Sequence, residues 1–529
     1  MKKHNTETNF SPIQGIIPAF LTDYLAIDDP VVVFDEIMKG IDLERYVKPL
    51  EKRYGRPSYN SVRMLKTILF GFMEEGYVSL RKLEDQCRVN IRYKYLMGFE
   101  MPSYRTFGHF IKKYLEDNVE ALFQMINAEI FKRDNVDLEH IYIDGSKFEA
   151  NANKYTWVWK KSAVKSRDKV FRQVTEFLNI LNETELNAFG VKIQTREEYA
   201  PEYLEAMSAQ YLSYFGVDVS SFTKGKGKRK TQVQRNYERL MEYARKLKKY
   251  RKQIATCGDY RNSYSKTDPD ATFMRMKRDY MKNDQLLPAY NVQIGVADEY
   301  IAVVDAQQFA SDMDCFVPLM EQFNRYYGHY PKYPVADAGY GSFNNYLYCQ
   351  EHGMEKYMKF PTFKKETKDK KYRENPYRVE NFPINEAGEL LCPEGRTMEF
   401  LKRQAIRGNK YGREEEIYVC KDCSNCPHAD KCKKGEGNRT VRLNAELTSI
   451  HQEVLNNLKS EEGIRLRTNR SIQAEGTFGI MKHDRWYKRM VRRGMKSVKT
   501  ELFLVSIGHN LYKYYNKHYA DPEELPETA

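Results

Sequence analysis

The sequence has no long hydrophobic run and no signature of secretion. No stretch approaches the roughly 18 consecutive apolar residues that a membrane-spanning helix needs. The opening stretch MKKHNTETNFSPIQG has no apolar core of the kind found in secretory signals. These absences argue against a membrane protein and against a secreted one, so we expect a cytoplasmic protein.

The sequence has fewer acidic residues than basic ones. Asp and Glu number 73 against 86 Lys and Arg, which gives a formal net charge of +13. A basic surface can serve solubility alone, but clustered positive charge favours a nucleic-acid partner, because it releases counterions from the phosphate backbone. With 529 residues the chain exceeds the usual size of a single core, so we expect two or more domains.

Residues 1–135 predict an all-helical N-terminal domain that binds DNA. Apolar residues recur at helical spacing in VVVFDEIMKGI and SVRMLKTILFGFMEEG, and turn residues in GRPS and MPS separate the segments. The second half has the arrangement of a helix-turn-helix reader of DNA, although helices joined by short turns are often simple packing elements.

From residue 136 the pattern predicts a mixed α/β sheet. HIYIDG is followed by AYNVQIGV and EYIAVVDAQQF, which we expect to form a hairpin that turns at Ala-Asp-Glu. A helix over residues 312–327, the strand in YPVADAGYG, a helix from Phe343 and the strand KYMKF continue the series. Residues 136–160, 286–360 and 461–515 would form this core, with residues 516–529 as a tail.

A basic helical insertion is expected over residues 161–285. Two apolar stripes at helical spacing can pair there: Phe171, Val174, Leu178 and Leu181 with Val233, Tyr237, Leu240, Ala244 and Leu247. Between Lys224 and Lys252 stand 13 basic residues and only two acidic ones. A charge run is often just a solvated face, but this excess favours contacts with DNA phosphates, with Lys228, Arg229 and Lys230 as candidates.

Three acidic residues lie where a metal-dependent site could form. Asp144 in IYIDGSK and Asp337 in VADAGYGS each follow an apolar strand and precede small residues, so we expect both at exposed strand ends. Asp-Gly is equally a hairpin turn signal. Glu475 lies on an expected helix amid positive charge, where simple charge balance is the alternative. Jointly, the three carboxylates suit hard cations such as Mg²⁺ or Mn²⁺ facing a phosphodiester.

The positive charge around Glu475 supplies further candidates for DNA contacts. They are Lys482, Arg485, Arg489, Arg492 and Arg493. Lysine and arginine side chains would hold the DNA strand whose phosphate meets the carboxylates.

These motifs, taken in order, resemble bacterial insertion-sequence transposases of the DDE class. YGRPSYNSVRMLKTILFGFMEEGYVSLRKLED, YIDGSKFEANANKYTWVWKK, VADAGYGSFNNY, NRSIQAEGTFGIMK and RRGMKSVKTELFLVSIGHNLYK carry the resemblance over most of the chain. It implies a ribonuclease H-like catalytic core, with Asp144, Asp337 and Glu475 as the catalytic acids. Two Mg²⁺ or Mn²⁺ ions would be the cofactors. Lys482, seven residues after Glu475, occupies the place of a lysine that contacts the transposon end. Arg470 lies five residues before Glu475, one more than in the related signature.

Five cysteines crowd into an expected second insertion, residues 361–460. The run YVCKDCSNCPHADKC follows Cys392, and two-residue gaps between cysteines are typical of metal chelation. Structural zinc, an iron–sulfur centre and reduced unligated thiols all remain open on spacing alone. The resemblance selects zinc ligands at Cys392, Cys423, Cys426 and Cys432 and leaves Cys420 as an alternative.

The sequence therefore predicts a transposase that cleaves the ends of an insertion sequence and transfers them into target DNA. Double-stranded DNA would be its partner, with a homodimer holding two ends, and the bacterial nucleoid would be its location. A metal-dependent nuclease without joining activity, or an inactive zinc-stabilised DNA-binding protein, are the alternatives.

Overall fold

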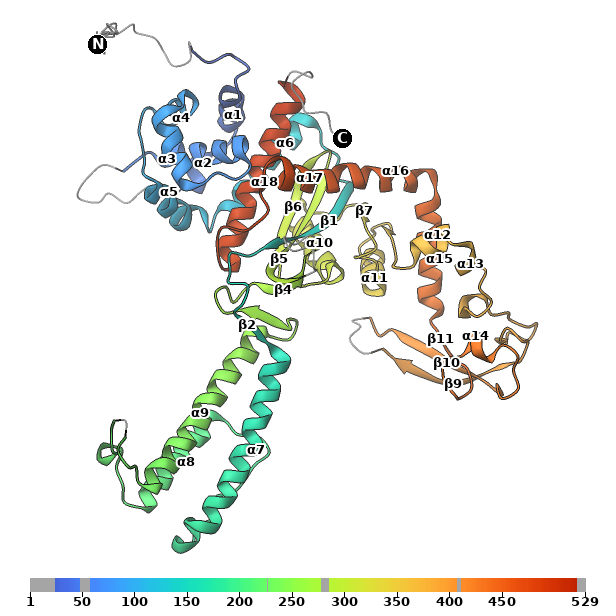
Figure 1. Ribbon diagram of the computed structural model, residues 1–529. Coiled ribbons are helices and arrows are strands. Elements are labelled where there is room, and N and C mark those ends of the chain that lie inside the picture. The colour runs from blue at the N-terminus through green and yellow to red at the C-terminus, as the bar shows by residue number, and fades with distance from the viewer. Residues whose placement is uncertain (1–23, 48–57, 226, 277–284, 407–410, 521–529) are drawn as a thin grey trace, which may run out of the picture.

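The computed structural model describes residues 24–47, 58–225, 227–276, 285–406 and 411–520, and everything below refers to these (Figure 1). None of the helices in these ranges combines the length and apolarity needed to cross a membrane.

A six-stranded mixed sheet lies at the centre of the molecule. Its strands are β1 (His140–Glu149), β4 (Thr272–Arg275), β5 (Leu286–Ala297), β6 (Tyr300–Gln307), β7 (Tyr333–Ala336) and β8 (Tyr357–Met358). β5 pairs antiparallel with β1 on one side and with both β4 and β6 on the other. β1 pairs parallel with β7, and β7 pairs parallel with β8. The sheet thus runs β6, β5, β1, β7, β8, with β4 alongside the first residues of β5.

The predicted hairpin between β5 and β6 is confirmed. Its turn residues Asp298 and Glu299 both have left-handed backbones, with φ of 46° and 71°, although neither is glycine. Neighbouring groups hold this turn: Lys517 Nζ donates to the Asp298 carbonyl at 2.7 Å, and the Glu299 N–H donates to Gln473 Oε1 at 3.0 Å. Tertiary contacts therefore support a backbone conformation that the residue types disfavour.

Helices pack around the sheet as the sequence indicates. They are α10 (Phe316–Tyr327), preceded by a 3₁₀ turn (Asp312–Cys315), α11 (Phe343–Glu351), α15 (Ala445–Lys459), α16 (Glu461–Arg470), α17 (Gly476–Gly479) and α18 (Met495–His518). The expected helix over 312–327 and the helix from Phe343 are confirmed.

The described residues of the N-terminal part, 24–47 and 58–135, are mainly helical, as expected, and the rest of this predicted domain lies outside the described residues. Its helices are α1 (Pro30–Lys39), α2 (Ser61–Glu75), α3 (Leu80–Val89), α4 (Ile91–Met97), α5 (Tyr104–Phe110) and α6 (Val119–Asp134). Asn60, Ser79 and Ser103 cap α2, α3 and α5 by accepting backbone N–H groups. Its buried residues are continuous with those of the sheet, because α18 packs on α2, α6 and β6 together. The helices and the sheet consequently share one core.

A long helical hairpin projects from one end of the sheet (Figure 1). It contains α7 (Lys160–Thr184), α8 (Pro201–Tyr214) and α9 (Gln232–Cys257), and β2 (Trp157–Trp159) pairs with β3 (Ser263–Ser265) at its base. The two predicted stripes meet in a separate hydrophobic core that includes Leu178 and Leu240. The expectation of helix up to residue 285 is wrong at β3 and β4, and β4 joins the central sheet; residues 277–284 lie outside the described residues.

The cysteine-rich segment forms a small module at the end of α15 (Figure 1). It contains α12 (Phe363–Lys368), α13 (Lys370–Arg373), α14 (Ala429–Cys432) and a three-stranded antiparallel sheet of β9 (Met398–Ala405), β10 (Glu414–Cys420) and β11 (Thr440–Leu443). Cys392, Cys420 and Cys423 belong to a hydrophobic cluster that is separate from the central core.

Candidate active site

Asp144 lies within a strand rather than at its end. β1 continues through Gly145 to Glu149, still paired with β5, so the predicted strand end at Asp144 is wrong. The pairing with β7, however, stops at Tyr142. Asp144 therefore stands just past the point where one edge of β1 loses its neighbour, and Asp337 directly follows β7 at the same place.

Gly145 makes room for polar side chains and does not form a turn. A Cβ at this position would lie 2.8 Å from Asp312 Oδ1 and 2.8 Å from the Tyr340 hydroxyl, with the Gln293 amide nearer still. Real Cβ atoms do not approach so closely, so a larger residue at position 145 would displace these side chains. The Asp-Gly pair thus reflects packing at the site, and the hairpin interpretation is wrong.

Arg470 connects Glu475 with Asp144. One guanidinium nitrogen, Nη1, lies 3.6 Å from Asp144 Oδ1, while Nη2 donates to Glu475 Oε1. Ser471 Oγ donates to the other Glu475 oxygen at 3.0 Å. The side chain of Arg470 is only 7% exposed. This buried cation brings two of the three predicted acids to one point.

A π-helical turn explains why the five-residue spacing between Arg470 and Glu475 works. Residues Ser471–Glu475 form this turn between α16 and α17. A π-turn bonds residue i to residue i+5, so it absorbs one extra residue and keeps both side chains on the same face. Sequence spacing alone could not reveal this.

Asp312 and Tyr340 complete the polar surroundings, and the sequence reasoning missed both. The Asp312 carboxylate accepts hydrogen bonds from Asn291 Nδ2 at 2.7 Å and Gln293 Nε2 at 3.1 Å, and Tyr340 donates to the Gln293 side-chain oxygen. Burial, followed by the charges of Asp312, Asp144 and Asp337, raises the pKa of Tyr340 well above its ordinary value. Only the connection that follows β6 places Asp312 here, which no local motif signals.

The carboxylates do not form a preformed metal site. Within the described part of the chain, no group of three or more His, Cys, Asp or Glu side chains is arranged to hold a metal ion. Three carboxylates are nonetheless the donor type that Mg²⁺ prefers. Glu475 is bonded to Arg470 and Ser471, and the Asp337 carboxylate accepts the Gly339 N–H at 2.7 Å.

Among the predicted DNA-contacting cations near Glu475, Lys482 lies beside the acids, and Arg489, Arg492 and Arg493 lie further along the chain. Lys482 Nζ donates to Ser146 Oγ at 2.6 Å and lies 4.1 Å from the ring centre of Phe148, so it sits against β1 beside Asp144. Arg489 is half exposed, 3.7 Å from Glu149, and the Arg493 Nε donates to the Asn151 carbonyl at 2.6 Å. The backbone of Arg492 donates to the buried Glu501.

Arg485, another predicted DNA contact, makes its contacts within the protein. Its guanidinium donates to the carbonyls of Phe72 at 3.3 Å and Met73 at 2.7 Å, and it lies 3.7 Å from the ring centre of Tyr512. These carbonyls belong to the last turn of α2, where the helix dipole favours a cation; the Phe72 carbonyl also accepts the Gly76 N–H at 3.0 Å. Arg485 thus joins the N-terminal helices to α18 instead of facing solvent.

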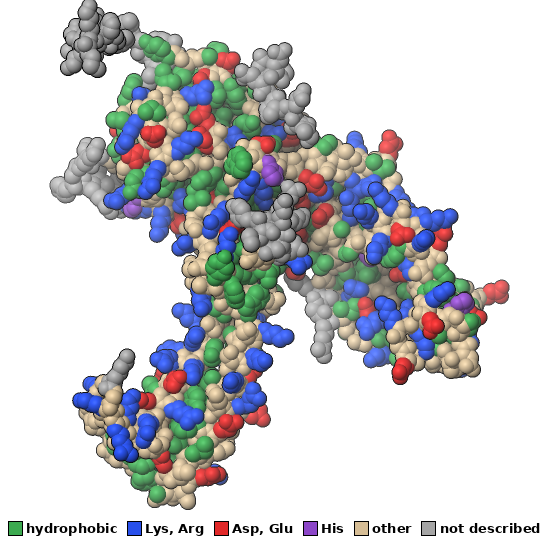
Figure 2. Space-filling view, viewed as in Figure 1, with side chains coloured by type: hydrophobic (Ala, Val, Ile, Leu, Met, Phe, Trp, Pro, Cys, Tyr) green, Lys and Arg blue, Asp and Glu red, His purple; other side chains and the backbone are tan. Residues whose placement is uncertain are grey.

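Basic residues spread over the projecting hairpin, as the blue side chains in Figure 2 show. Lys228 and Arg229 are exposed at its tip. Lys230 instead bonds both oxygens of Glu238, at 2.6 and 2.9 Å, so part of its charge is neutralised within the hairpin.

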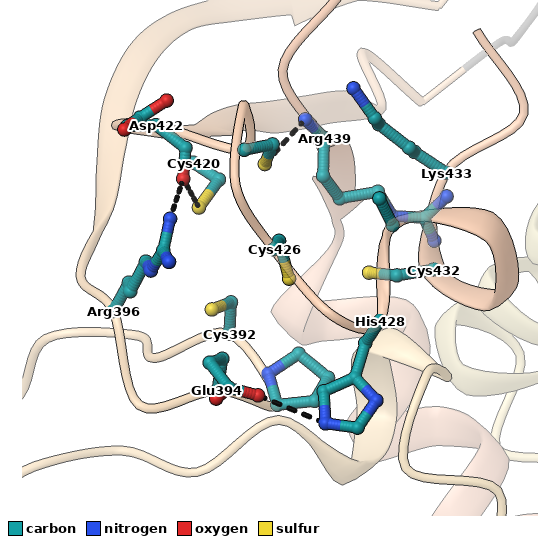
Figure 3. A pocket seen from close by; sticks show the side chains of 13 residues that line it. Cys392, Glu394, Arg396, Cys420, Asp422, Cys426, His428, Cys432, Lys433 and Arg439 are labelled. Carbon is teal, nitrogen blue, oxygen red and sulfur yellow. Dashed lines mark hydrogen bonds and ion pairs between the residues drawn. The ribbon is translucent and has the colours of Figure 1, made fainter.

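All five clustered cysteines line one cavity of about 20 Å³, which is room for a single small atom (Figure 3). The Arg439 N–H donates to Cys423 Sγ at 3.4 Å. Burial, with the neighbouring Cys423 and Cys392, raises the pKa of Cys420 to about 12. His428 also lines the cavity, bonded to Glu394 at 2.9 Å.

Two families of transposase domains match the chain. One, described as Transposase DDE domain, matches residues 391–515, and the other, described as Transposase domain (DUF772), matches residues 22–113. Together these matches support an insertion-sequence DDE transposase. No curated protein and no solved structure matches this transposase.

The matched residues include Glu475, Lys482 and the cysteines, but Asp144 and Asp337 lie outside both matches. The roles of these two acids in the transposase consequently depend on where the fold places them. Divalent metal ions such as Mg²⁺ are the general cofactors of DDE transposases, and DNA is their substrate.

Proposed function

We propose that this transposase cleaves DNA at the ends of its insertion sequence and joins the freed ends to target DNA, with Asp144, Asp337 and Glu475 as its catalytic carboxylates. The observation that carries the proposal is the contact of Arg470 with both Asp144 and Glu475, since it draws together residues far apart in the sequence. Asp337, at the end of the strand next to β1, adds the third acid.

The order of the strands supports a ribonuclease H-like core. Three strands, β6, β5 and β1, are joined by antiparallel pairing, and β7 and β8 extend the sheet in parallel. The first acid then lies on the central strand and the second at the end of its parallel neighbour. Such a strand end is rigid, which suits carboxylates that must meet a phosphodiester in a fixed geometry.

Two chemical steps would use this one site. In the first, water attacks the phosphorus at the transposon end, and the bond from phosphorus to the 3′ oxygen breaks to leave a free 3′-hydroxyl. In the second, that 3′-hydroxyl attacks a phosphodiester of target DNA and displaces its 3′ oxygen. Bound Mg²⁺ or Mn²⁺ ions would lower the pKa of the attacking hydroxyl and neutralise charge on the phosphate.

The remaining residues would bind and orient the DNA. Lys482 is held against β1 by Ser146, two residues from Asp144. Its ammonium would therefore lie beside the path of a DNA strand that reaches the acids. Arg489, Arg492 and Arg493 follow on the next loop, and Lys228, Arg229 and Lys230 lie on the hairpin. Holding two transposon ends together would require two copies of the protein.

Zinc in the cysteine cavity is a separate part of the proposal. Thiolates are the ligands of structural zinc, and Cys392, Cys423, Cys426 and Cys432, with Cys420 as an alternative, line a cavity of the size of one ion. The described sulfurs are not in a preformed ligand arrangement. A bound ion would stabilise the small sheet of this module, away from the acids.

Cleavage and joining assays test the proposal. Duplexes carrying the element's terminal repeats are incubated with Mg²⁺ and target plasmid, using wild type and the Asp144→Asn, Asp337→Asn and Glu475→Gln variants. We expect each variant to lose cleavage while it still binds the duplex. Glu462→Gln, a partly exposed acid on α16 that pairs with Arg465, is the matched control. Cleavage that survives in one variant removes that acid from the site, and cutting without joined products identifies a nuclease.

A further inference from the structure

Lys359 is a partly buried lysine beside the candidate acids, and its ammonium has no hydrogen-bond or ion-pair partner among the described residues. Its neighbour Lys356 shows the ordinary alternative: that buried ammonium bonds both oxygens of Glu453, at 2.7 and 3.0 Å. The Lys359 ammonium still reaches solvent, but partial burial weakens its hydration, so an anionic ligand would supply the partner that it lacks.

The sheet fixes Lys359 next to Asp337. β7 and β8 are parallel, with Ala336 opposite Met358, so the next residues along, Asp337 and Lys359, lie side by side. The Lys359 N–H approaches the Ala336 carbonyl at 3.5 Å. A Cβ on Gly341 would collide with the Lys359 carbonyl, so the loop after Asp337 packs directly on this residue.

The electrostatic surroundings leave Lys359 without a neutralising anion. Burial, and then the positive charges of Arg470 and Arg467, lower the pKa of Lys359, against smaller opposing effects of Asp337 and Glu475. Glu475 is already bonded to Arg470 and Ser471, and Asp337 to the Gly339 N–H. Both nearby carboxylates already have hydrogen-bond partners, so the Lys359 ammonium is open to an incoming anion.

We propose that Lys359 binds a non-bridging phosphate oxygen of the DNA strand held at Asp144, Asp337 and Glu475. This role presupposes the proposed function. A phosphodiester brought to the acids carries the missing negative charge, and a lysine ammonium can follow it as it changes shape, because it imposes no fixed fork geometry.

The test compares Lys359→Met and Lys359→Arg with Lys332→Met. Lys332 is an exposed lysine directly before the start of β7, at the opposite end of the strand from Asp337. Three quantities are measured for each full-length protein: the single-turnover cleavage rate at saturating DNA, the salt dependence of binding to end duplex, and the melting temperature without DNA.

We expect Lys359→Met to lower the cleavage rate by about tenfold or more, as for removal of one charge-assisted hydrogen bond, and Lys332→Met to leave it unchanged. The salt slope should become shallower by roughly 0.9 in Lys359→Met. Lys359→Arg should recover part of the rate. Without DNA, Lys359→Met should melt at the same or a higher temperature, because an unpaired charge has been removed.

Two results would overturn this role. One is a Lys359→Met protein that cleaves and binds like Lys332→Met while the wild type is active. The other is a lower melting temperature that accounts for the reduced rate, since that marks a merely structural lysine. A wild-type protein that neither binds nor cleaves end duplex would instead remove the proposed function itself.

Discussion

Single contacts separate the exposed cations near Glu475 from those bonded within the protein. Arg485 and Arg489 are four residues apart in the same basic run, and composition treats them alike. In the fold, Arg485 is bonded to carbonyls at the end of α2, whereas Arg489 is half exposed beside Glu149. The density of charge in a sequence therefore predicts a binding region but not its individual contacts.

Replacing Arg485 with alanine should lower the free energy of unfolding by about 2–4 kcal/mol, because it removes charged hydrogen bonds and the packing on Tyr512. The salt dependence of DNA binding should not change. Arg489→Ala should behave in the opposite way, with unaltered stability and a slope shallower by roughly 0.9. Chemical denaturation and a salt series of binding titrations measure both. A slope change in Arg485→Ala would return it to the DNA contacts.

At the scale of elements, hydrophobic periodicity predicted the β5–β6 hairpin, α10, α11 and the pairing of α7 with α9, because burial on one face produces these patterns. It failed where tertiary contacts decide. The chain passes through Asp144–Gly145 as a strand because β5 still supplies hydrogen bonds there. The π-turn before Glu475, and Asp312 and Lys359 beside the acids, depend on residues distant in sequence.

The projecting hairpin should add affinity without choosing the sequence of the DNA. Lysines are point charges, and backbone neutralisation needs only nearby positive charge. A Lys228→Ala and Arg229→Ala double variant should bind cognate and random duplexes more weakly by the same factor, with a salt slope shallower by roughly 0.9 for each phosphate that is no longer neutralised. Lys230→Ala should change the slope less, because Glu238 already pairs with it. Weaker binding of the cognate duplex alone would indicate base reading.

The cysteine module should contain about one zinc ion per chain, since four thiolates satisfy one tetrahedral ion. In the Cys423→Ser, Cys426→Ser double variant we expect elemental analysis to find the metal gone and the module's melting temperature lowered. Cys257→Ser, a buried cysteine of the hairpin base, is the control and should retain the metal. Iron with visible absorption, or metal-free wild type, would contradict zinc.

The hydrophobic cores of the molecule do not follow the order of segments along the chain. The N-terminal helices and the sheet share one core, centred on α18, whereas the hairpin has its own. Asn510 on α18 shows how closely the first two are joined: it bonds Asn127 on α6 at 2.8 Å and both backbone groups of Ile301 on β6.

Calorimetry should therefore resolve the hairpin from the rest. Leu178→Ala, in the hairpin core, should lower the melting temperature of the hairpin transition alone. Leu504→Ala, on α18, should lower that of the main transition alone. Each substitution should reduce the free energy of unfolding of its own unit by about 2–5 kcal/mol. Both leucines are 0% exposed, so the substitutions are matched. Equal shifts of a single transition in the two variants would show that the protein unfolds as one unit.

The position of α18 also sets an order of events during synthesis. Every other helix and strand described here leaves the ribosome before α18 does, yet α2, α6 and β6 all bury their apolar faces against it. The nascent chain must hold these faces uncovered until residues 495–518 emerge, while the hairpin can fold as soon as α9 is made. Chaperones would thus encounter this protein mainly through its N-terminal half, and a ribosome that stalls before residue 495 would release a product with no completed core around the acids.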